Sequence, residues 1–203
     1  MTRDILDTLP VQRDHFILES GYHTDVWLTL DGLFVSPREI AGQVAALADL
    51  LRPHSVSAVC GPLLGGAFLA HAVAAHMGIR FYFTQRVSLN REGLFTAEYR
   101  LPREPRRQIA KERVAIVDDA ISAGSSVRAT DAELTSAGAT TVVVGAILLL
   151  GDRAAQHFSS RGIPVIALAS QSLNLWSPPD CPLCRTGVPL ENPLAFKDDA
   201  ISE

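Results

Sequence analysis

An acidic pair followed by a run of small residues is the part of this sequence best suited to chemistry. Residues 114–117 are apolar and predict a buried strand, and Asp118 and Asp119 follow it directly. A helix is expected from Val127 to Ala137. The loop between them is built from small residues, namely Ser122, Ala123, Gly124, Ser125 and Ser126. Backbone N–H groups of such a loop, together with the start of a helix, are suited to binding a phosphate.

The acidic pair has a different task from the loop. Carboxylates repel a phosphate, so Asp118 and Asp119 are better placed to accept hydrogen bonds from sugar hydroxyls. The combination predicts a site for ribose 5-phosphate. The alternative is an ordinary α/β strand end whose acidic pair holds Mg²⁺, as in P-loop proteins. The chain has no GxxxxGK[ST] sequence, which disfavours that alternative.

Residues 114–127 resemble the phosphoribosyl pyrophosphate (PRPP) signature of the type I phosphoribosyltransferases, and about residues 12–170 are most similar to the orotate phosphoribosyltransferase branch. The resemblance implies that Asp118 and Asp119 bind the ribose hydroxyls during catalysis and that residues 122–126 bind the 5′-phosphate. It also implies Mg²⁺ as cofactor, bound through PRPP without a direct protein ligand.

A second glycine-rich turn lies between a strand expected at 56–60 and an alanine-rich helix expected at 67–77. Its glycines permit close approach of the backbone to a bulky anion, and it lacks the spacing of a dinucleotide-binding turn. By the resemblance, this turn binds pyrophosphate. Its residues are Gly61, Pro62, Leu63, Leu64, Gly65 and Gly66.

Residues 16–34 resemble the F-x-L-K-S-G motif that covers the base in the orotate branch, with matches at Phe16, Leu18, Ser20 and Gly21. Trp27 lies near the position of the family's base contacts. Glu19 replaces the family's lysine, and a carboxylate there disfavours an anionic base.

Residues 150–153 resemble the family's L-x-D-R turn, whose arginine pairs with the carboxylate of orotate. Two parallel hydrogen bonds join a guanidinium to a carboxylate well, so Arg153 is a candidate base-binding residue. The alternative is a salt bridge between Arg153 and Asp152 at the start of a helix.

Residues 87–112 lose all apolar periodicity, which is typical of a functional or disordered surface excursion. The resemblance places the family's mobile catalytic loop here. Arg86 matches that loop, and Arg91 stands near one of its lysines. Both are therefore candidate catalytic residues, although the other lysines and the histidine of the family loop are missing.

Composition sets the broad class. The chain has 203 residues, 47% of them hydrophobic and 20% charged, with a formal net charge of −4. These values suit one globular domain and give no indication of nucleic-acid binding. The N-terminus lacks an apolar core, and no apolar run is long enough to span a membrane, so a cytoplasmic protein is expected.

Three cysteines do not make a disulfide framework. Cys181 and Cys184 form a CPLC pair, which alone supplies too few ligands for a structural zinc site. Cys60 or a histidine would have to fold back to complete one.

Alternating strand and helix patterns predict an α/β fold. By the resemblance this is the type I phosphoribosyltransferase fold, a parallel twisted sheet flanked by helices with a small hood. We expect a single domain over 1–203, with a hood from 1–36 and 170–203, a core from 37–169 and a mobile loop at 87–112. Further helices are expected at 38–51 and 152–160, and further strands at 79–83, 141–149 and 163–168. The resemblance also implies a homodimer.

The leading hypothesis is transfer of ribose 5-phosphate from PRPP to orotate, giving orotidine 5′-monophosphate and pyrophosphate. Glu19 motivates one alternative, a transferase for a non-anionic base. The altered loop at 87–112 motivates another, a catalytically weak protein that senses PRPP or a nucleotide.

Overall fold

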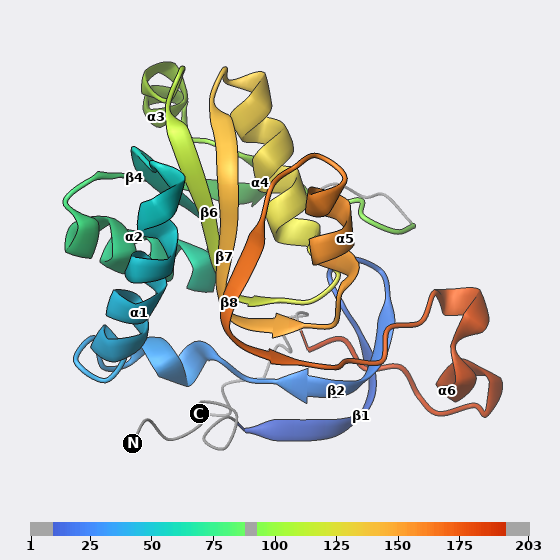
Figure 1. Ribbon diagram of the computed structural model, residues 1–203. Helices are drawn as coiled ribbons and strands as arrows, with labels where there is room; N and C mark the ends of the chain where they lie inside the picture. The colour runs from blue at the N-terminus through green and yellow to red at the C-terminus, as the bar shows by residue number, and fades with distance from the viewer. Residues whose placement is uncertain (1–9, 88–92, 194–203) are drawn as a thin grey trace, which may run out of the picture.

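Buried apolar strands and amphipathic helices alternate along the chain, and the strands form one central sheet (Figure 1). The computed structural model describes residues 10–87 and 93–193. Within them the central sheet has six strands in the order β5-β4-β3-β6-β7-β8. Their bounds are β3 Ala58–Pro62, β4 Arg80–Val87, β5 Glu98–Arg100, β6 Arg113–Ile121, β7 Thr140–Leu150 and β8 Val165–Gln171.

Five of these strands run parallel, and β5 pairs antiparallel with β4 at the edge. The chain goes from β3 to β4 on one side, then returns to β6 on the other side of β3. The strand order therefore reverses between β3 and β6. Crevices at the carboxyl ends of strands beside such a reversal are where α/β sheets bind ligands.

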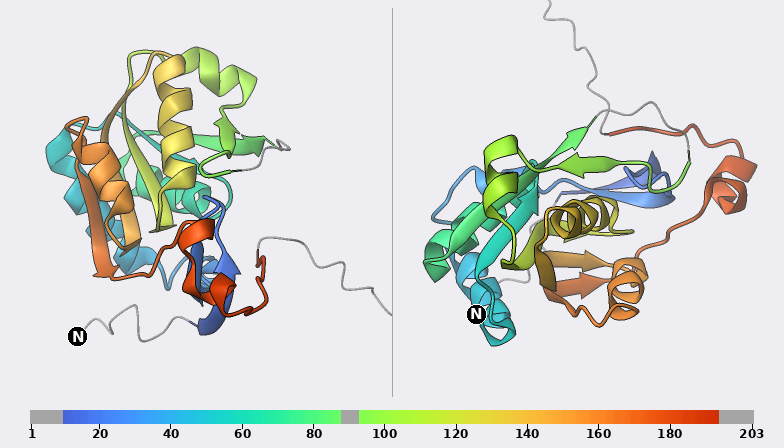
Figure 2. Two further views of the ribbon diagram at one scale, coloured as in Figure 1. Left: turned by 90° about the vertical axis from the view of Figure 1, so that its right-hand side faces the viewer. Right: turned by 90° about the horizontal axis from the view of Figure 1, so that it is seen from above.

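Helices cover both faces of the sheet (Figures 1 and 2). Successive residues of β6 alternate between two cores, because strand side chains point to opposite faces. Ala115 and Val117 pack with α1 (Ala41–Leu51) and α2 (Gly65–Met77). Val114 and Ile116 pack with α4 (Ser125–Ser136) and α5 (Arg153–Ser159). Short helices in the described part of the chain include η2 Asp31–Phe34, η3 Arg52–His54, α3 Arg103–Gln108 and η4 Pro178–Asp180.

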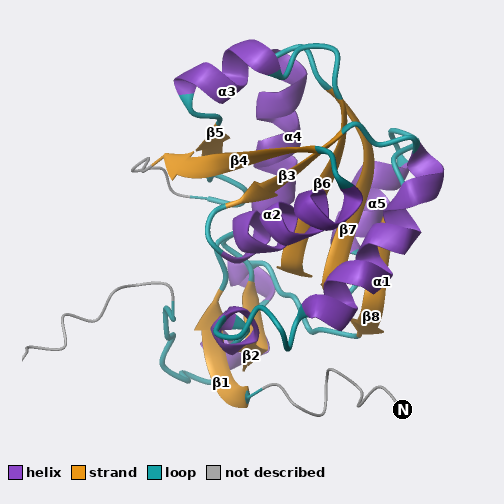
Figure 3. Ribbon diagram, turned by 90° about the vertical axis from the view of Figure 1, so that its left-hand side faces the viewer, coloured by secondary structure: helices purple, strands orange, loops and turns teal. Residues whose placement is uncertain are grey.

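A separate hairpin lies beyond the carboxyl ends of β6, β7 and β8 (Figure 3). It consists of β1 (Val11–Ile17) and β2 (His23–Leu28), paired antiparallel. The C-terminal segment, with α6 (Pro182–Arg185), returns to this hairpin through bridges from Phe16 to Glu191 and from His23 to Trp176. The hairpin and this segment lie within the ranges predicted for the hood, and the bounds of the hood stay a prediction.

The helices and strands expected from periodicity are present, with ends shifted by a few residues. The segment 87–112 differs from the expectation of a loop without regular structure, because it contains β5 and α3 and buries Tyr99, Leu101 and Ile109. Its mobility stays a prediction. Among the described residues, no helix is long and apolar enough to cross a membrane.

Candidate active site

The acidic pair lies at the carboxyl end of β6, against the first residues of α2. Asp118 is 7% exposed, and its Oδ2 accepts a hydrogen bond of 2.8 Å from Ser126 Oγ. A Cβ on Gly66 would lie 2.5 Å from Asp118 Oδ1, and a Cβ on Gly65 would overlap the carboxylate of Asp119. The two glycines therefore make room for the pair, and the start of α2 offers its partial positive charge to the carboxylates.

Burial raises the pKa of Asp118 well above its usual 3.8, and the charge of Asp119 raises it further, against the opposing bond from Ser126. Burial also raises the pKa of Asp119. Two carboxylates side by side in a poorly hydrated site are costly to ionise together. A ligand with hydroxyl donors would relieve that cost by hydrogen bonding to them.

The small-residue loop ends at the N-terminus of α4. Gly124 precedes the helix with a φ of +85°, a conformation that favours glycine. Ser125 Oγ is buried beside it and makes no hydrogen bond to the described residues. The first N–H groups of a helix lack partners within the helix, so together with the Ser125 hydroxyl and the helix dipole they are suited to binding an anion.

The predicted pyrophosphate turn faces the same space from the end of β3. Pro62, Leu63, Leu64 and Gly65 line it, and the peptide bond between Leu63 and Leu64 is cis. Gly61 lies behind the turn, where a Cβ would collide with the backbone of Gly66.

One cavity of about 300 Å³ joins these parts and is covered by the hairpin. Its lining includes most of the predicted site residues, namely Glu19, Trp27, Pro62, Leu63, Leu64, Gly65, Asp118, Asp119, Ser122, Gly124, Ser125 and Ser126. Gly61, Gly66, Arg86, Ala123 and Arg153 are not among the lining residues. Arg91 lies outside the described residues.

Glu19 is paired within the cavity wall. Its Oε1 lies 3.2 Å from Arg86 Nε and accepts a hydrogen bond of 2.8 Å from the Tyr99 hydroxyl. The guanidinium therefore offsets the negative charge of Glu19. Burial and the Glu19 charge raise the pKa of Tyr99, which remains a neutral donor.

Arg153 begins α5 and is held by Tyr22 of the hood. Its guanidinium carbon lies 4.4 Å from the centroid of the Tyr22 ring, and its Nη1 donates to the Tyr22 hydroxyl over 3.1 Å. The salt bridge between Arg153 and Asp152 that sequence left open is not found in the structure, since Asp152 accepts from Gln156 instead.

Some cavity residues carry no signal in the sequence. Tyr99 comes from the segment without periodicity, and Leu173 closes the cavity from beyond β8. No local pattern marks these residues, because only the packing of the hood over the sheet brings them to the site.

The sequence model of the phosphoribosyl transferase domain matches residues 38–179. The chain belongs to the phosphoribosyltransferase family. A protein of Thermotoga petrophila named orotate phosphoribosyltransferase is 34% identical over 199 residues, which cover 95% of this chain and 97% of that protein. A protein of the same name from Caldanaerobacter subterraneus is 29% identical, with 92% of each chain covered.

Solved structures show the same phosphoribosyltransferase fold. The orotate phosphoribosyltransferase of Aeropyrum pernix superposes with a TM-score of 0.63 at 22% identity, covering 79% of this chain and 87% of that one. The adenine phosphoribosyltransferase of Thermoanaerobacter pseudethanolicus gives 0.61 at 16% identity, covering 82% and 98%. At these identities the likeness concerns the fold, which orotate and adenine enzymes share.

Proposed function

We propose that this phosphoribosyltransferase transfers the ribose 5-phosphate of PRPP to orotate, releasing pyrophosphate and orotidine 5′-monophosphate. The observation that carries the proposal is one cavity in which a carboxylate pair lies beside the N-terminus of α4, which is suited to binding an anion. The similarity to proteins named orotate phosphoribosyltransferase over nearly the full chain supports orotate as the base.

The residues divide the work of holding PRPP. Asp118 and Asp119 accept hydrogen bonds from the ribose hydroxyls, and the loop 122–126 binds the 5′-phosphate through N–H groups and hydroxyls. The turn 61–66 receives the pyrophosphate. The bond from C1 of ribose to pyrophosphate oxygen breaks as a ring nitrogen of the base bonds to C1, and the proton of that nitrogen passes to solvent. Positive charge that develops on the sugar is stabilised by the nearby carboxylates.

The donors at this site fit magnesium. Mg²⁺ prefers carboxylate and phosphate oxygens and keeps several waters, so PRPP phosphates would supply its ligands while the acidic pair lining the cavity would accept hydrogen bonds from its waters. When bound with PRPP, Mg²⁺ would neutralise charge on the departing pyrophosphate. That it binds through PRPP without a direct protein ligand stays a prediction.

The base contacts are compatible with an anion. Pairing with Arg86 offsets the negative charge of Glu19, so Glu19 does not by itself reject orotate. Arg153 would contact the orotate carboxylate by leaving Tyr22, since its guanidinium hydrogen-bonds to and stacks on that side chain.

We also propose that the enzyme is a homodimer. Val35, Leu64 and Phe68 are 84%, 68% and 54% exposed, and Phe68 packs against Phe34 at a ring distance of 5.8 Å. Large apolar side chains exposed around the start of α2 are suited to burial by a second copy of the chain. The cytoplasmic location stays a prediction from sequence.

The test is a spectrophotometric assay of PRPP and Mg²⁺ with orotate, uracil, adenine and hypoxanthine. We expect turnover of orotate, and in Arg153→Ala a KM for orotate raised at least tenfold with unchanged affinity for PRPP. Asp49→Asn, on the exposed surface of α1, is the control. Turnover of a neutral base alone would overturn the orotate assignment. PRPP binding without turnover of any base would favour a sensor.

A further inference from the structure

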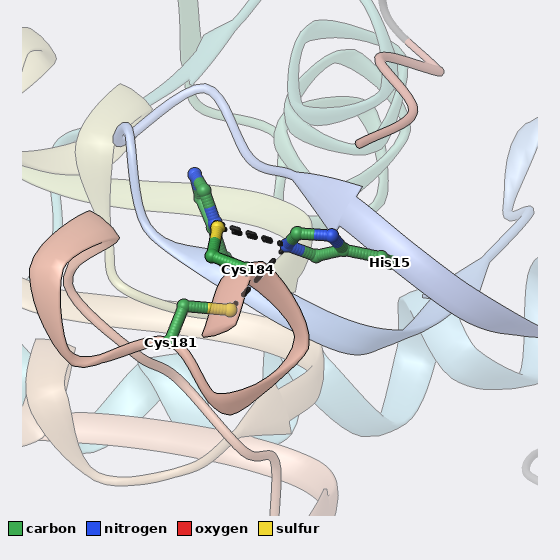
Figure 4. A group of neighbouring side chains, drawn as sticks. His15, Cys181 and Cys184 are labelled. Carbon is green, nitrogen blue, oxygen red and sulfur yellow. Dashed lines mark hydrogen bonds between the residues drawn. The ribbon is translucent and has the colours of Figure 1, made fainter. Parts of the chain in front are cut away.

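Two histidines and two cysteines from opposite ends of the chain meet beside the hood hairpin. His15 lies in β1, and His23 is the first residue of β2. Cys181 directly precedes α6, and Cys184 lies within α6. One nitrogen or sulfur atom of each lies within 4.8 Å of the corresponding atoms of the others. Figure 4 shows the side chains of His15, Cys181 and Cys184 directed toward one another.

Four of the six separations among these atoms are close to the edges of a coordination tetrahedron, and all six are within 4.8 Å. Zinc–nitrogen bonds of about 2.05 Å and zinc–sulfur bonds of about 2.3 Å place tetrahedral ligand atoms about 3.4 Å (N to N) and 3.6 Å (N to S) apart. His15 Nε2 lies 3.0 Å from His23 Nδ1 and 3.4 Å from Cys181 Sγ. Cys184 Sγ lies 3.7 Å from His15 Nε2 and 3.3 Å from His23 Nδ1. All four separations fall within about 0.4 Å of the ideal edges.

A neighbouring carbonyl orients one of the imidazoles. His15 Nδ1 lies 2.9 Å from the Val188 carbonyl oxygen, which can only accept, so Nδ1 carries the proton. In the neutral ring, Nε2 then holds a free lone pair facing the other three residues. Metal-binding histidines commonly donate their second nitrogen in this way.

Three of the four candidate ligands are buried. His15, His23 and Cys181 are 1%, 4% and 0% exposed, whereas Cys184 reaches the surface. Four protein ligands leave no open position for a substrate, and this is the form of a structural zinc site. Two thiolates and two neutral imidazoles balance the charge of a divalent cation, which suits a buried position.

We propose that His15, His23, Cys181 and Cys184 bind a structural zinc ion that fastens the C-terminal segment to the hood hairpin. The two thiols lose their protons to solvent when zinc binds. This site is separate from the magnesium expected with PRPP, and its assignment does not depend on the identity of the base. Of the two completions that the sequence left open, Cys60 or a histidine folding back, the structure brings two histidines and not Cys60 to the CPLC pair.

The ion would stabilise a part of the molecule that is weak by itself. A two-stranded hairpin is marginally stable without further packing. The described contacts between the hairpin and the segment after β8 include two isolated bridges and the hydrogen bond from His15 to Val188. Leu18, Glu19, Val26 and Trp27, which line the cavity, lie on the hairpin or its turn. A zinc crosslink here would therefore hold the cover of the active site in place.

The first experiment measures metal on the full-length protein. The chain is produced in zinc-supplemented medium, purified under a reductant without a chelator, and analysed by mass spectrometry for zinc per chain. We expect one zinc per chain in the wild type and in the controls Cys60→Ala and His76→Ala, whose side chains lie outside the cluster. Cys184→Ser and His15→Gln should lose most of it. Cys184 is exposed, so its variant is expected to fold.

The second experiment replaces zinc by cobalt. Apo-protein titrated with Co²⁺ should show the strong visible bands of tetrahedral cobalt and a near-ultraviolet thiolate-to-cobalt band, both weakened in Cys184→Ser. Wild-type protein with free thiols that takes up neither zinc nor cobalt would overturn the proposal. So would a Cys181–Cys184 disulfide that persists under the reductant. The spectrum needs no turnover, so an inactive enzyme would not affect the result.

Discussion

At the residue scale, burial of Asp118 beside Asp119 carries an electrostatic cost that its proposed role in binding PRPP would explain. Burial and the neighbouring Asp119 raise its pKa, so the folded protein resists ionising this group more than the unfolded chain does. A raised pKa makes the group's contribution to stability most favourable at low pH. That contribution is lost as the pH rises through the folded-state pKa.

We therefore predict opposite effects of Asp118→Asn on stability and on activity. At pH 7 the variant should unfold at a temperature a few degrees higher, because the buried charge is gone. Its kcat/KM should fall on the order of 10²-fold or more, as should that of Asp119→Asn, because acceptors for ribose and stabilisation of the cationic sugar are lost. Calorimetry and initial rates measure both, with Asp49→Asn as control. Unchanged kcat/KM in both variants would remove the acidic pair from the site.

Glu19 and Arg86 form the second pair at this scale. Because the ion pair joins their charges beside the proposed base site, removing one charge exposes the other. Glu19→Gln should lower the KM for orotate several-fold, and Arg86→Gln should raise it. The double variant should fall between them. Equal KM values in all four proteins would show that the pair does not face the base.

How far sequence can predict these residues depends on distance along the chain. The acidic pair and loop 122–126 are contiguous, so their strand, turn and helix signals fix their arrangement. Glu19 read alone predicts repulsion of an anion, and the charge of Arg86 that offsets it lies on β4, far along the chain. His15 and His23 give no metal-binding spacing with Cys181 and Cys184, since folding of the whole chain brings the two pairs together.

At the scale of elements, α2 approaches the end of β6 closely because two glycines at the start of α2 have no side chains. Gly65 and Gly66 begin α2 where the carboxylates of Asp119 and Asp118 lie. The sequence predicts that these glycines allow close approach to an anionic ligand. The structure shows that they also accommodate the protein's own acidic pair.

We predict that Gly65→Ala lowers kcat/KM at least tenfold, because its Cβ would displace the Asp119 carboxylate. Gly42→Ala is the matched control. Gly42 lies in α1, where an added Cβ would meet no neighbouring side chain or other element within 4 Å. Alanine there should stabilise the protein by roughly 0.5–1 kcal/mol without loss of activity. A fully active Gly65→Ala protein would contradict the packing argument.

A buried carboxylate on α4 holds β5 and α3 against the core. Arg100 and Arg106 donate to Glu133 over 3.0 and 2.8 Å, and Glu133 also accepts from the Leu101 N–H. In sequence, the basic residues of this segment are typical of a solvated loop. Their partner lies on a helix that follows later in the chain, so no local pattern predicts the ordered structure.

Burial alone would raise the pKa of Glu133, but the hydrogen bonds from Arg100 and Arg106 outweigh it and lower the pKa below its usual 4.5. A lowered pKa stabilises the fold at higher pH, and this stability is lost as the pH falls through the folded-state pKa. Glu133→Gln should therefore cost about 2 kcal/mol at pH 7. Chemical denaturation should show the difference shrinking below pH 4.5. A difference in unfolding free energy that does not change with pH would mean that the shape of the Glu133 side chain, rather than its charge, holds β5 and α3 in place.

At the scale of the whole molecule, the order of strands decides where the site forms. Alternating strands and helices predict a parallel sheet. The spacing of apolar residues in a strand does not depend on which strand it pairs with, so this spacing cannot predict the strand order. The return of the chain across β3 to β6 places the turn 61–66 opposite the loop 118–126. The residues alone do not predict this strand order, and the expectation drawn from the family resemblance names a fold type without a strand order.

The state of assembly is the remaining prediction at this scale. If a second copy covers the apolar side chains at the start of α2, a charge placed there should separate the copies, because an unpaired carboxylate is costly to bury. Phe68→Glu should convert a dimer into a monomer by light scattering at micromolar concentration. Leu190→Glu, at a 44% exposed position in the C-terminal segment, should remain a dimer.

Phe68 is absent from the cavity lining, so PRPP affinity of the monomer should change little while turnover falls if the partner contributes to closure. A wild-type monomer with full activity would refute the dimer, and a dimeric Phe68→Glu would place the contact elsewhere.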